Sequence, residues 1–387
     1  MSQFRFIVAV AVALFVTQAA SLMVAPLLVD IALEFDTSVA VAGQLATATF
    51  AAWAISVVTV GPMSDSFGRR PVALTGLSLL CIGTLASAFA PNLGTLMAFR
   101  VLTGLGGGMI PPNSLAAIAD VVAPSRRAQA VGGIMAFNTL SSVIAIPLLA
   151  VAAQWGGWRL PFVITGVTLA ACVVLNWFWF PKNEGSGLKD FTFFSRYRTL
   201  LAIPIFRAAI VVNFAQRMAF FGLFSYLAAY LIDAYGMSVG AVALPLAFAG
   251  LGRVVGSWMA GPVAIRKNRM TLVALFSLAG GIAALLLFLV DFPIWAVVAI
   301  AFVAVTMLSI GWPVLITLST EVSGQSRATG VGMLGFSNQT GGVGGAAIGG
   351  VVLAASGFPG IGYLCLGAAI FSSVVITLFM RKAVPQN

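Results

Sequence analysis

The sequence predicts an all-α integral membrane protein of twelve transmembrane helices in two six-helix halves. Only 8% of its 387 residues are charged and 60% are hydrophobic, whereas about a quarter of the residues of a soluble domain are charged. Apolar runs of about 20 residues recur along the whole chain, and each would cross a bilayer core about 30 Å thick as a helix. Runs of this length exclude a membrane barrel, which is built from short alternating strands.

The apolar runs fall into two sets of six, separated by a polar segment. The first set covers residues 6–29, 40–60, 72–90, 95–119, 128–152 and 161–180, and the second covers 206–232, 238–263, 270–290, 293–318, 328–354 and 359–380. The stretch from Pro181 to Arg198 between them is the longest of low hydrophobicity. We therefore expect an N-terminal half over residues 1–180, a central cytoplasmic loop over 181–205 and a C-terminal half over 206–387.

Lysine and arginine gather on one side of this topology. If the N-terminus is cytoplasmic, sixteen of them lie on the cytoplasmic side and only Arg159 lies on the other. The sixteen are Arg5, Arg69, Arg70, Arg126, Arg127, Lys182, Lys189, Arg196, Arg198, Arg207, Arg266, Lys267, Arg269, Arg327, Arg381 and Lys382. Because loops rich in Lys and Arg stay in the cytoplasm, we expect both termini there, in a bacterial-type inner (plasma) membrane. This topology explains the net charge of +10 without a nucleic-acid partner.

A polar turn between the second and third runs is repeated 200 residues later. The segment 61–71 reads GPMSDSFGRRP, and the segment 261–269 reads GPVAIRKNR. A second region agrees at the same offset, since Asn138 corresponds to Asn338. Halves that each start on the inside are related as parallel repeats, and substrate sites in such transporters lie between the halves near the membrane midplane.

The first turn resembles the signature of the major facilitator superfamily. The residues that carry the resemblance are Gly61, Asp65, Gly68, Arg69 and Arg70. The resemblance extends over essentially the whole chain, with its twelve spans, central loop and degenerate second signature, and it implies the major facilitator fold. The sequence departs from the signature at Ser66, where the family usually has an arginine.

Two further motifs are similar to the drug:proton antiporter branch of that superfamily. The first is RVLTGLGGG, from Arg100 to Gly108, and the second is Trp158-Arg159-x-x-Phe162. The fifth-span motif of that branch is reduced here to Ile146-Pro147. The branch as a whole implies export coupled to proton entry.

The resemblance also implies that the first turn acts as a cytoplasmic latch, which would stabilise the outward-facing state. Its members would be Gly61, Asp65, Gly68, Arg69 and Arg70. Carboxylates and guanidinium groups at helix ends can pair with each other and with helix dipoles. The alternative is that the arginines only set the topology. The second turn has Ile265 in place of the acid, so we expect it to supply only positive charge and glycine and to be the weaker latch.

Three arginines lie inside apolar runs, and we take them as the strongest site candidates. Each costs about 2.5–3.5 kcal/mol to insert, so such residues usually face a water-filled cavity or a partner. In the seventh run, polar and aromatic residues share one helical stripe around Arg217. The residues expected to line the substrate cavity are Gln18, Arg100, Asn138, Asn213, Gln216, Arg217, Phe220, Phe224, Arg253 and Asn338. For Arg253, which has glycine neighbours, the alternative is a structural role.

Acidic residues are missing from the middle of every apolar run. Asp30, at the outer end of the first run, is the one candidate for proton coupling, and a solvated helix end is its alternative role. A cavity with basic groups and no acidic ones would attract anions or zwitterions and disfavour cations. The sequence therefore favours an anionic or amphipathic substrate.

The sequence offers no enzyme chemistry, metal site or cofactor site. It contains no histidine, and its three cysteines lie inside apolar runs, where they are small packing residues. The glycine-rich segments 104–108 and 341–350 follow no strand and precede no Gly-Lys-Ser/Thr, so they are helix contacts and not phosphate loops.

These observations together predict a secondary active transporter that works by alternating access. The first hypothesis is export of a small amphipathic or anionic organic compound, coupled to proton entry. The second is an uncoupled facilitator or importer of an organic anion, which the missing buried acid favours. A membrane enzyme or receptor is the alternative from another class, and the lack of catalytic residues argues against it. The family resemblance leads us to expect a functional monomer.

Overall fold

The structure is a computed structural model that describes residues 3–181, 193–323 and 327–380, without the side chains of residues 62, 65, 124, 125, 127–129, 193–197, 327 and 328. Within these ranges every regular element is helical. The elements are α1 (Gln3–Leu22), η1 (Ala25–Leu27), α2 (Leu28–Glu34), α3 (Val39–Ala42), α4 (Gln44–Phe67), α5 (Arg69–Ser87), α6 (Leu93–Val121), α7 (Pro124–Leu140), α8 (Ala145–Gly156), α9 (Arg159–Trp179), α10 (Phe193–Ala202), α11 (Pro204–Tyr235), α12 (Ala243–Ala264), α13 (Arg269–Leu289), α14 (Ile294–Val322), α15 (Arg327–Val375) and the π-helical turn η3 (Ile376–Met380).

The predicted all-α membrane fold is confirmed. Among the described residues, 11 helical segments are long and apolar enough to cross a membrane. The last of them, Thr329–Met380, is 52 residues long and contains Gly357, whose φ of 66° is not helical. A left-handed glycine is a common helix end, so this segment is two crossings, and the count agrees with the expected twelve. The sequence placed the same boundary between residues 354 and 359.

The helix is interrupted within two of the spans, the first and the fifth. The first span changes from α1 to α2 through η1, which contains Pro26. The fifth span is interrupted between α7 and α8, over Ser141–Ile144. Proline alone does not break a span, because Pro111 and Pro112 lie within α6 and Pro313 lies within α14.

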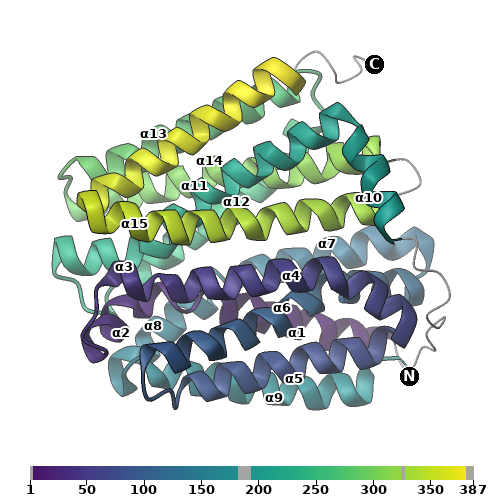
Figure 1. Cartoon of the computed structure of the whole chain (residues 1–387), viewed down its shortest axis with the longest axis horizontal. Helices are drawn as coiled ribbons and strands as arrows, with labels where there is room; N and C mark the ends of the chain where they lie inside the picture. The colour runs from purple at the N-terminus through teal and green to yellow at the C-terminus, as the bar shows by residue number, and fades with distance from the viewer. Residues whose placement is uncertain (1–2, 182–192, 324–326, 381–387) are drawn as a thin grey trace.

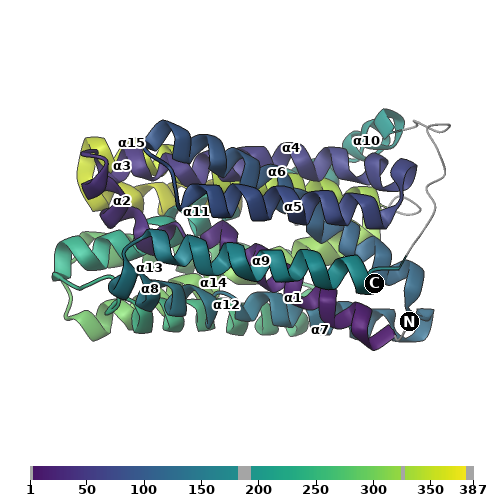
Figure 2. The same ribbon diagram turned by 90° about the horizontal axis from the view of Figure 1, so that it is seen from below.

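The helices form two bundles whose axes run side by side (Figure 1). Helices α1–α9 form one bundle and α10–α15 the other, and both termini lie at one end, called the terminal end below. The view from below shows α4 and α15 together on one outer face (Figure 2). Across the boundary, α4 packs against α15, α8 against α12 and η1 against α11.

Buried apolar side chains join the two bundles at one end only. A large cluster contains residues of both bundles, such as Leu28 from α2 and Phe224 from α11. Nearer the terminal end, the cluster around Phe6 belongs to the first bundle and the cluster around Val212 belongs to the second. The bundles therefore share a core at the end away from the termini and have separate cores near the terminal end.

The contact between α4 and α15, called the seam below, becomes looser towards the terminal end. A methyl group added at Gly350 would lie 2.8 Å from a carbonyl oxygen of α3, and one added at Gly342 would lie 3.1 Å from the Phe50 ring. A methyl group at Gly335 would lie 3.6 Å from α4, and one at Gly332 would meet nothing within 4 Å. Close approach of the bundles thus requires glycine at the far end of the seam and not at the terminal end.

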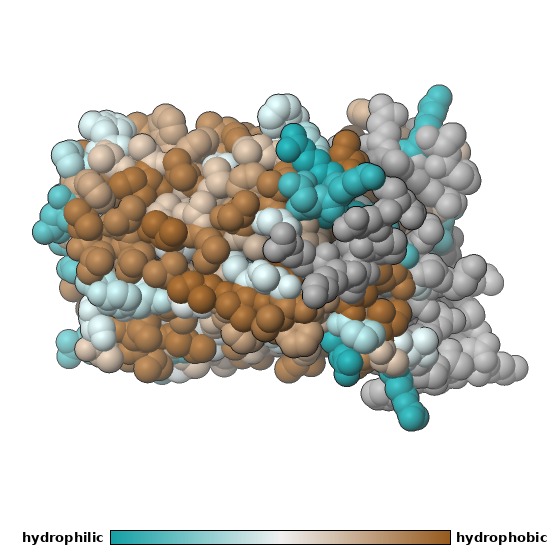
Figure 3. All heavy atoms as spheres, turned by 90° about the horizontal axis from the view of Figure 1, so that it is seen from above, coloured by the Kyte–Doolittle hydropathy of each residue, from teal (hydrophilic) through white to brown (hydrophobic). Residues whose placement is uncertain are grey.

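The surface carries a broad apolar belt (Figure 3). Hydrophobic residues cover most of the face shown, and hydrophilic residues gather towards the two ends. Such a belt is what lipid chains would cover, and it supports the identification of an integral membrane protein.

Candidate functional site

The middle of α11 carries a buried stripe of polar and aromatic side chains. Asn213, Gln216, Arg217, Phe220 and Phe224 are all at most 5% exposed. Glycines on the neighbouring helices α14 and α15 make room for this stripe. A methyl group at Gly341 would lie 2.6 Å from the Cβ of Arg217, and one at Gly311 would overlap the Gln216 amide. The bulky stripe and the facing glycines therefore fit together.

Two guanidinium groups approach one aromatic ring at this place. The Cζ of Arg217 lies 4.9 Å from the ring centroid of Phe220, and the Cζ of Arg253 on α12 lies 5.8 Å from the same centroid. Arg217 also donates a hydrogen bond of 2.5 Å from Nη2 to the Leu308 carbonyl oxygen of α14. The ring attracts both cations through its negative face, and it holds two like charges close together. We call these three residues and the neighbouring Asn213 and Gln216 the arginine cluster.

Several buried polar atoms of the arginine cluster have no partner among the described residues. They are Asn213 Oδ1, Gln216 Nε2 and Oε1, and Arg217 Nε. A buried polar atom without a hydrogen bond costs about 1–3 kcal/mol, so native proteins rarely leave several in one place. Their presence together marks a place where a ligand or water would be stabilised.

The arginine cluster has no acidic partner in the described part of the chain. The ion pairs among the described residues are Arg69–Asp120, Arg159–Glu34 and Arg269–Glu321, and all three lie at the ends of spans. No group of three potential metal ligands occurs among the described residues either. Uncompensated positive charge in a low-dielectric surrounding favours an anionic ligand.

Stacked phenylalanines connect the arginine cluster to the boundary between the bundles. Phe220 and Phe224 stack with ring centroids 5.8 Å apart and an interplanar angle of 9°. Phe224 lines a small cavity of about 10 Å³ together with Ser21, Ala25 and Phe50 of the first bundle. The arginine cluster therefore lies one helical turn from the contact between the bundles.

The structure places Arg100 apart from the arginine cluster, in the interior of the first bundle. Arg100 is fully buried, and its Nε donates to Thr49 Oγ1 over 3.0 Å while its Nη2 donates to the Ala20 carbonyl oxygen over 2.9 Å. Its Cζ lies 5.8 Å from the ring of Phe162. These contacts tie α6 to α1, α4 and α9. The prediction that Arg100 binds substrate is not supported by a shared location with Arg217.

The three remaining predicted cavity residues make local or helix-joining hydrogen bonds. Gln18 Nε2 donates to Ser21 Oγ over 3.4 Å within the first span. Asn138 Nδ2 donates to the Leu14 carbonyl oxygen over 2.8 Å and so joins α7 to α1. Asn338 Nδ2 lies 3.5 Å from the amide oxygen of its neighbour Gln339. All three are partly exposed.

At the first repeated turn, the side chain of Asp65 lies outside the described residues. Arg69 Nε approaches Asp120 Oδ2 at 3.3 Å, and Arg69 Nη1 donates to Ser64 Oγ over 2.6 Å. Arg70 donates to the carbonyl oxygen of Trp177 on α9. Gly68, with φ of 93°, makes the turn between α4 and α5, while Gly61 has open space around it. The predicted latch residues thus join α5 to α4, α6 and α9 within one bundle.

The second turn itself supplies positive charge and glycine, as expected, but it gains an acidic partner from another helix. Arg269 forms a two-pronged ion pair with Glu321, with Nη1 and Oε1 2.8 Å apart and a second contact from Nη2 to Oε2. The acid comes from the end of α14, so it replaces an acid in the turn itself. Glu321 is the counterpart of Asp120, which lies at the end of α6.

The outer acids take different roles. Asp30 on α2 is partly exposed and has no hydrogen bond or ion pair with other described residues. Glu34 accepts a 2.6 Å hydrogen bond from Trp158 Nε1 and pairs with Arg159. Arg159 in turn lies 4.3 Å from the Trp158 ring. The Trp158-Arg159 motif therefore fastens the start of α9 to the end of α2.

Sequence reasoning missed the residues that complete these groups. Glu321 could have been found, because it lies within one position of the 200-residue offset from Asp120. The carbonyl groups of Ala20 and Leu308 carried no such signal, since any residue type supplies a backbone oxygen. Tyr226, which donates to the Ala346 carbonyl oxygen over 2.7 Å beside the tight end of the seam, was also missed.

Comparison with known proteins places this arrangement in a family. The family model described as Major Facilitator Superfamily matches residues 10–343. An uncharacterized MFS-type transporter of Bacillus subtilis, YwfA, is 26% identical over 97% of this chain and 92% of that protein. The gentisate transporter of Corynebacterium glutamicum is 28% identical over 71% of this chain and 64% of that protein. A bacterial homologue of the human lysosomal transporter Spinster, solved in an inward-facing and unoccupied conformation, has the same fold with a TM-score of 0.73, at 20% identity over 98% of this chain and 96% of that one.

Proposed function

This chain belongs to the major facilitator superfamily and is a membrane transporter of small molecules, not an enzyme; we propose that it exports a small amphipathic or anionic organic compound by alternating access, coupled to proton entry. The observation that carries the substrate class is the arginine cluster. Two guanidinium groups lie against one phenylalanine ring and have no acidic partner among the described residues. They would therefore attract a negatively charged group of the substrate.

The neighbouring aromatic residues favour a substrate with an apolar or aromatic part. The stacked rings of Phe220 and Phe224 extend from the two arginines towards the contact between the bundles. A flat organic acid would place its carboxylate against Arg217 and Arg253 and its ring against this stack. The relative named as a gentisate transporter supports this class, because gentisate is an aromatic carboxylate.

Alternating access is supported by the unequal contact between the bundles. A shared core at one end and separate cores at the other are expected of two bodies that rock about a central site. If the terminal end is cytoplasmic, as the distribution of Lys and Arg predicts, this is the inward-open arrangement.

Aromatic ligands of similar size and opposite charge test the substrate class. We expect benzoate or gentisate to raise the thermal unfolding midpoint of the purified protein, because a ligand that binds the folded state stabilises it. Benzylamine, of similar size and opposite charge, should leave the midpoint unchanged. Equal stabilisation by the amine would contradict the proposal.

The uncoupled facilitator or importer is the second candidate, favoured by the exposure of Asp30 and by the lack of an acid in the arginine cluster. Proteoliposomes separate the two. Export coupled to protons predicts that an imposed pH gradient drives the anion against its own gradient, and that Asp30→Asn abolishes this drive. Flux that ignores the pH gradient would establish the facilitator.

A further inference from the structure

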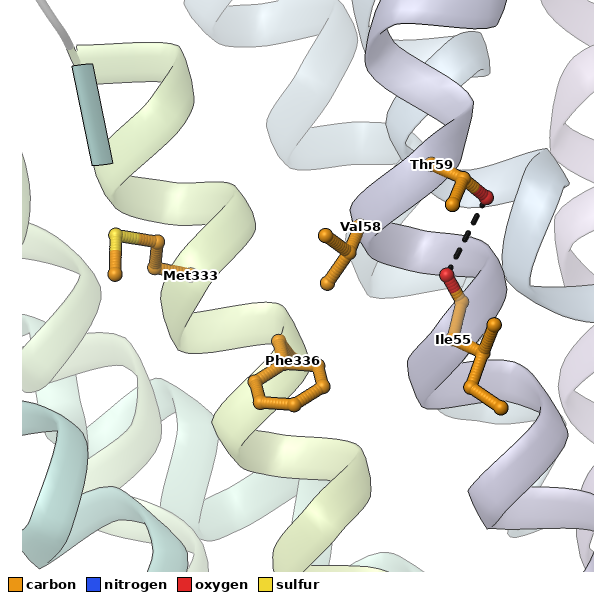
Figure 4. Close-up of a pocket in the computed structure, with 5 residues that line it drawn as sticks. All are labelled: Ile55, Val58, Thr59, Met333 and Phe336. Carbon is orange, nitrogen blue, oxygen red and sulfur yellow. Dashed lines mark hydrogen bonds between the residues drawn. The ribbon is translucent and has the colours of Figure 1, made fainter. Parts of the chain in front are cut away.

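A cavity of about 390 Å³ lies in the seam between α4 and α15. Its lining residues, shown in Figure 4, are Ile55, Val58, Thr59, Met333 and Phe336. The hydroxyl of Thr59 donates to carbonyl oxygens of its own helix, at 3.3 Å to Ile55 and 3.1 Å to Ser56. The Thr59 hydroxyl hydrogen is therefore used within its own helix, and the other four lining residues are apolar.

The cavity lies on an outer face of the molecule. Its two walls belong to the spans Val39–Gly61 and Thr329–Met380, which lie together on one outer face of the molecule (Figure 2). Ile55 is 62% exposed and Phe336 is 39% exposed. At this depth the medium is hydrocarbon, so the natural occupant is an acyl chain. A volume of about 30 Å³ for a group the size of water or methylene gives room for about a dozen carbons.

Two exposed arginines neighbour, along the chain, residues that pack with one wall of the cavity. Met333 packs in one apolar cluster with Leu200 of α10 and Phe206 of α11. Arg198, two residues before Leu200, and Arg207, next to Phe206, are both exposed. Basic side chains at the membrane surface attract anionic lipid headgroups, so the chain in the cavity would be one from an anionic lipid.

We propose that the seam between α4 and α15 is a binding site for an anionic phospholipid, with one acyl chain in the cavity and the headgroup at Arg198 and Arg207. The site is separate from the arginine cluster and does not depend on which compound is transported. Because the two walls belong to different bundles, a chain bound here opposes their approach at the terminal end. The lipid therefore favours the arrangement described above over one closed at that end.

Photolabelling in nanodiscs tests the site directly. The probe is phosphatidylglycerol with a photoreactive group on one acyl chain, and labelled peptides are identified by mass spectrometry. We expect about fivefold more label on residues 55–59 and 333–336 than around Ile82 of α5, which is 56% exposed on another lipid-facing surface. Equal labelling would mean a general lipid shell only and would overturn the proposal.

Matched variants separate filling of the cavity from a general change of surface. Val58→Trp fills the cavity and should lower labelling of residues 333–336 about tenfold, whereas the control Ile82→Trp should leave it unchanged. The same chain on phosphatidylcholine should label the wild type less, and Arg198→Gln should remove that difference between headgroups. Equal labelling of the wild type by both lipids would overturn the assignment of the headgroup.

A distance measurement tests the effect on the bundles. Spin labels at Phe67→Cys and Gly332→Cys report on the two sides of the seam, since Phe67 is 59% exposed and Gly332 has open space, while all three native cysteines are buried. We expect a larger share of long distances in phosphatidylglycerol than in phosphatidylcholine. Distributions that do not depend on the lipid would contradict the proposed effect on conformation.

Discussion

Both bundles use an arginine to join their first and fourth spans, but they take it from opposite helices. In the first bundle Arg100 of α6 donates to the Ala20 carbonyl oxygen of α1. In the second bundle Arg217 of α11 donates to the Leu308 carbonyl oxygen of α14. Arg100 also has Thr49 as a partner, whereas Arg217 lies beside Arg253 and beside unpaired amide groups.

The difference is consistent with the proposal that Arg217 binds the substrate, and it predicts a mainly structural role for Arg100. Nε and Nη2 of Arg100 each donate a hydrogen bond to a group of the first bundle, although its Nη1 has no partner among the described residues. Arg217 and Arg253 repel each other across Phe220, and a bound anion would relieve that repulsion. The same helix pair in each repeat thus supports two distinct roles, and substitutions can separate them.

The largest effect should follow Arg217→Ala. Loss of a charge-assisted hydrogen bond costs about 2–3 kcal/mol, so anion binding should weaken about 100-fold. Binding to purified protein and transport at equal surface expression measure this loss. Arg217→Lys keeps a charge and should retain part of the affinity. Wild-type affinity in Arg217→Ala would break the proposed division of roles.

Arg100→Ala should chiefly destabilise the fold. It leaves a cavity and removes the partners of Thr49 and the Ala20 carbonyl group, at a cost of about 2 kcal/mol in the free energy of unfolding. Affinity per folded molecule should stay near that of the wild type. Arg100→Met, which fills the space without a charge, should recover part of the stability. A selective loss of anion binding in both variants would instead support the predicted role of Arg100 in substrate binding.

The two repeated turns should respond differently to alanine. Gly68 has φ of 93°, whereas Asn268, at the same place in the second repeat, has φ of −94°. Gly68→Ala should therefore cost about 1–2 kcal/mol, because a side chain is strained in that conformation. Asn268→Ala should be nearly neutral in thermal unfolding. Similar losses at both positions would show that backbone conformation does not set the difference.

The smallest effect concerns the ion pairs at the terminal end. Glu321→Gln breaks a two-pronged pair with an arginine whose side chain is 10% exposed, whereas Asp120→Asn breaks a single contact to one that is 21% exposed. Both acids are largely exposed, so we expect losses of only about 1 kcal/mol and about 0.5 kcal/mol. The thermal midpoints of the two variants measure the order, and a larger loss in Asp120→Asn would reverse it.

The sequence was sufficient for the fold because membrane spans are encoded locally. Apolar run lengths predicted twelve crossings and placed a boundary near Gly357, where the structure has a left-handed residue. The repeat was also readable, because both copies keep glycine and arginine at fixed positions. Contacts between helices that are far apart in the sequence were harder to predict. Glu321 was not recognised as the partner of Arg269, because the acid comes from another helix.

The candidate site was predicted in part. The residues of the predicted stripe on α11 are all buried, and helical spacing places them on one face, while their role in binding stays a prediction. Spacing does not determine which neighbouring helix that face meets. Arg100 and Arg217 were therefore expected to line one cavity, whereas the hydrogen bonds that each makes with described residues lie within its own bundle.

The contact between α4 and α15 is close at one end and loose at the other, so a rotation about the close end displaces the loose end. Gly350, at the tight end, and Gly332, at the loose end, lie about 27 Å apart along a helix that rises 1.5 Å per residue. A rigid rotation of about 15° about the tight end would move the loose end by roughly 7 Å. Small changes in packing at Gly350 would therefore cause larger displacements at the terminal end. A larger side chain at the tight end would change how far the two bundles can rotate.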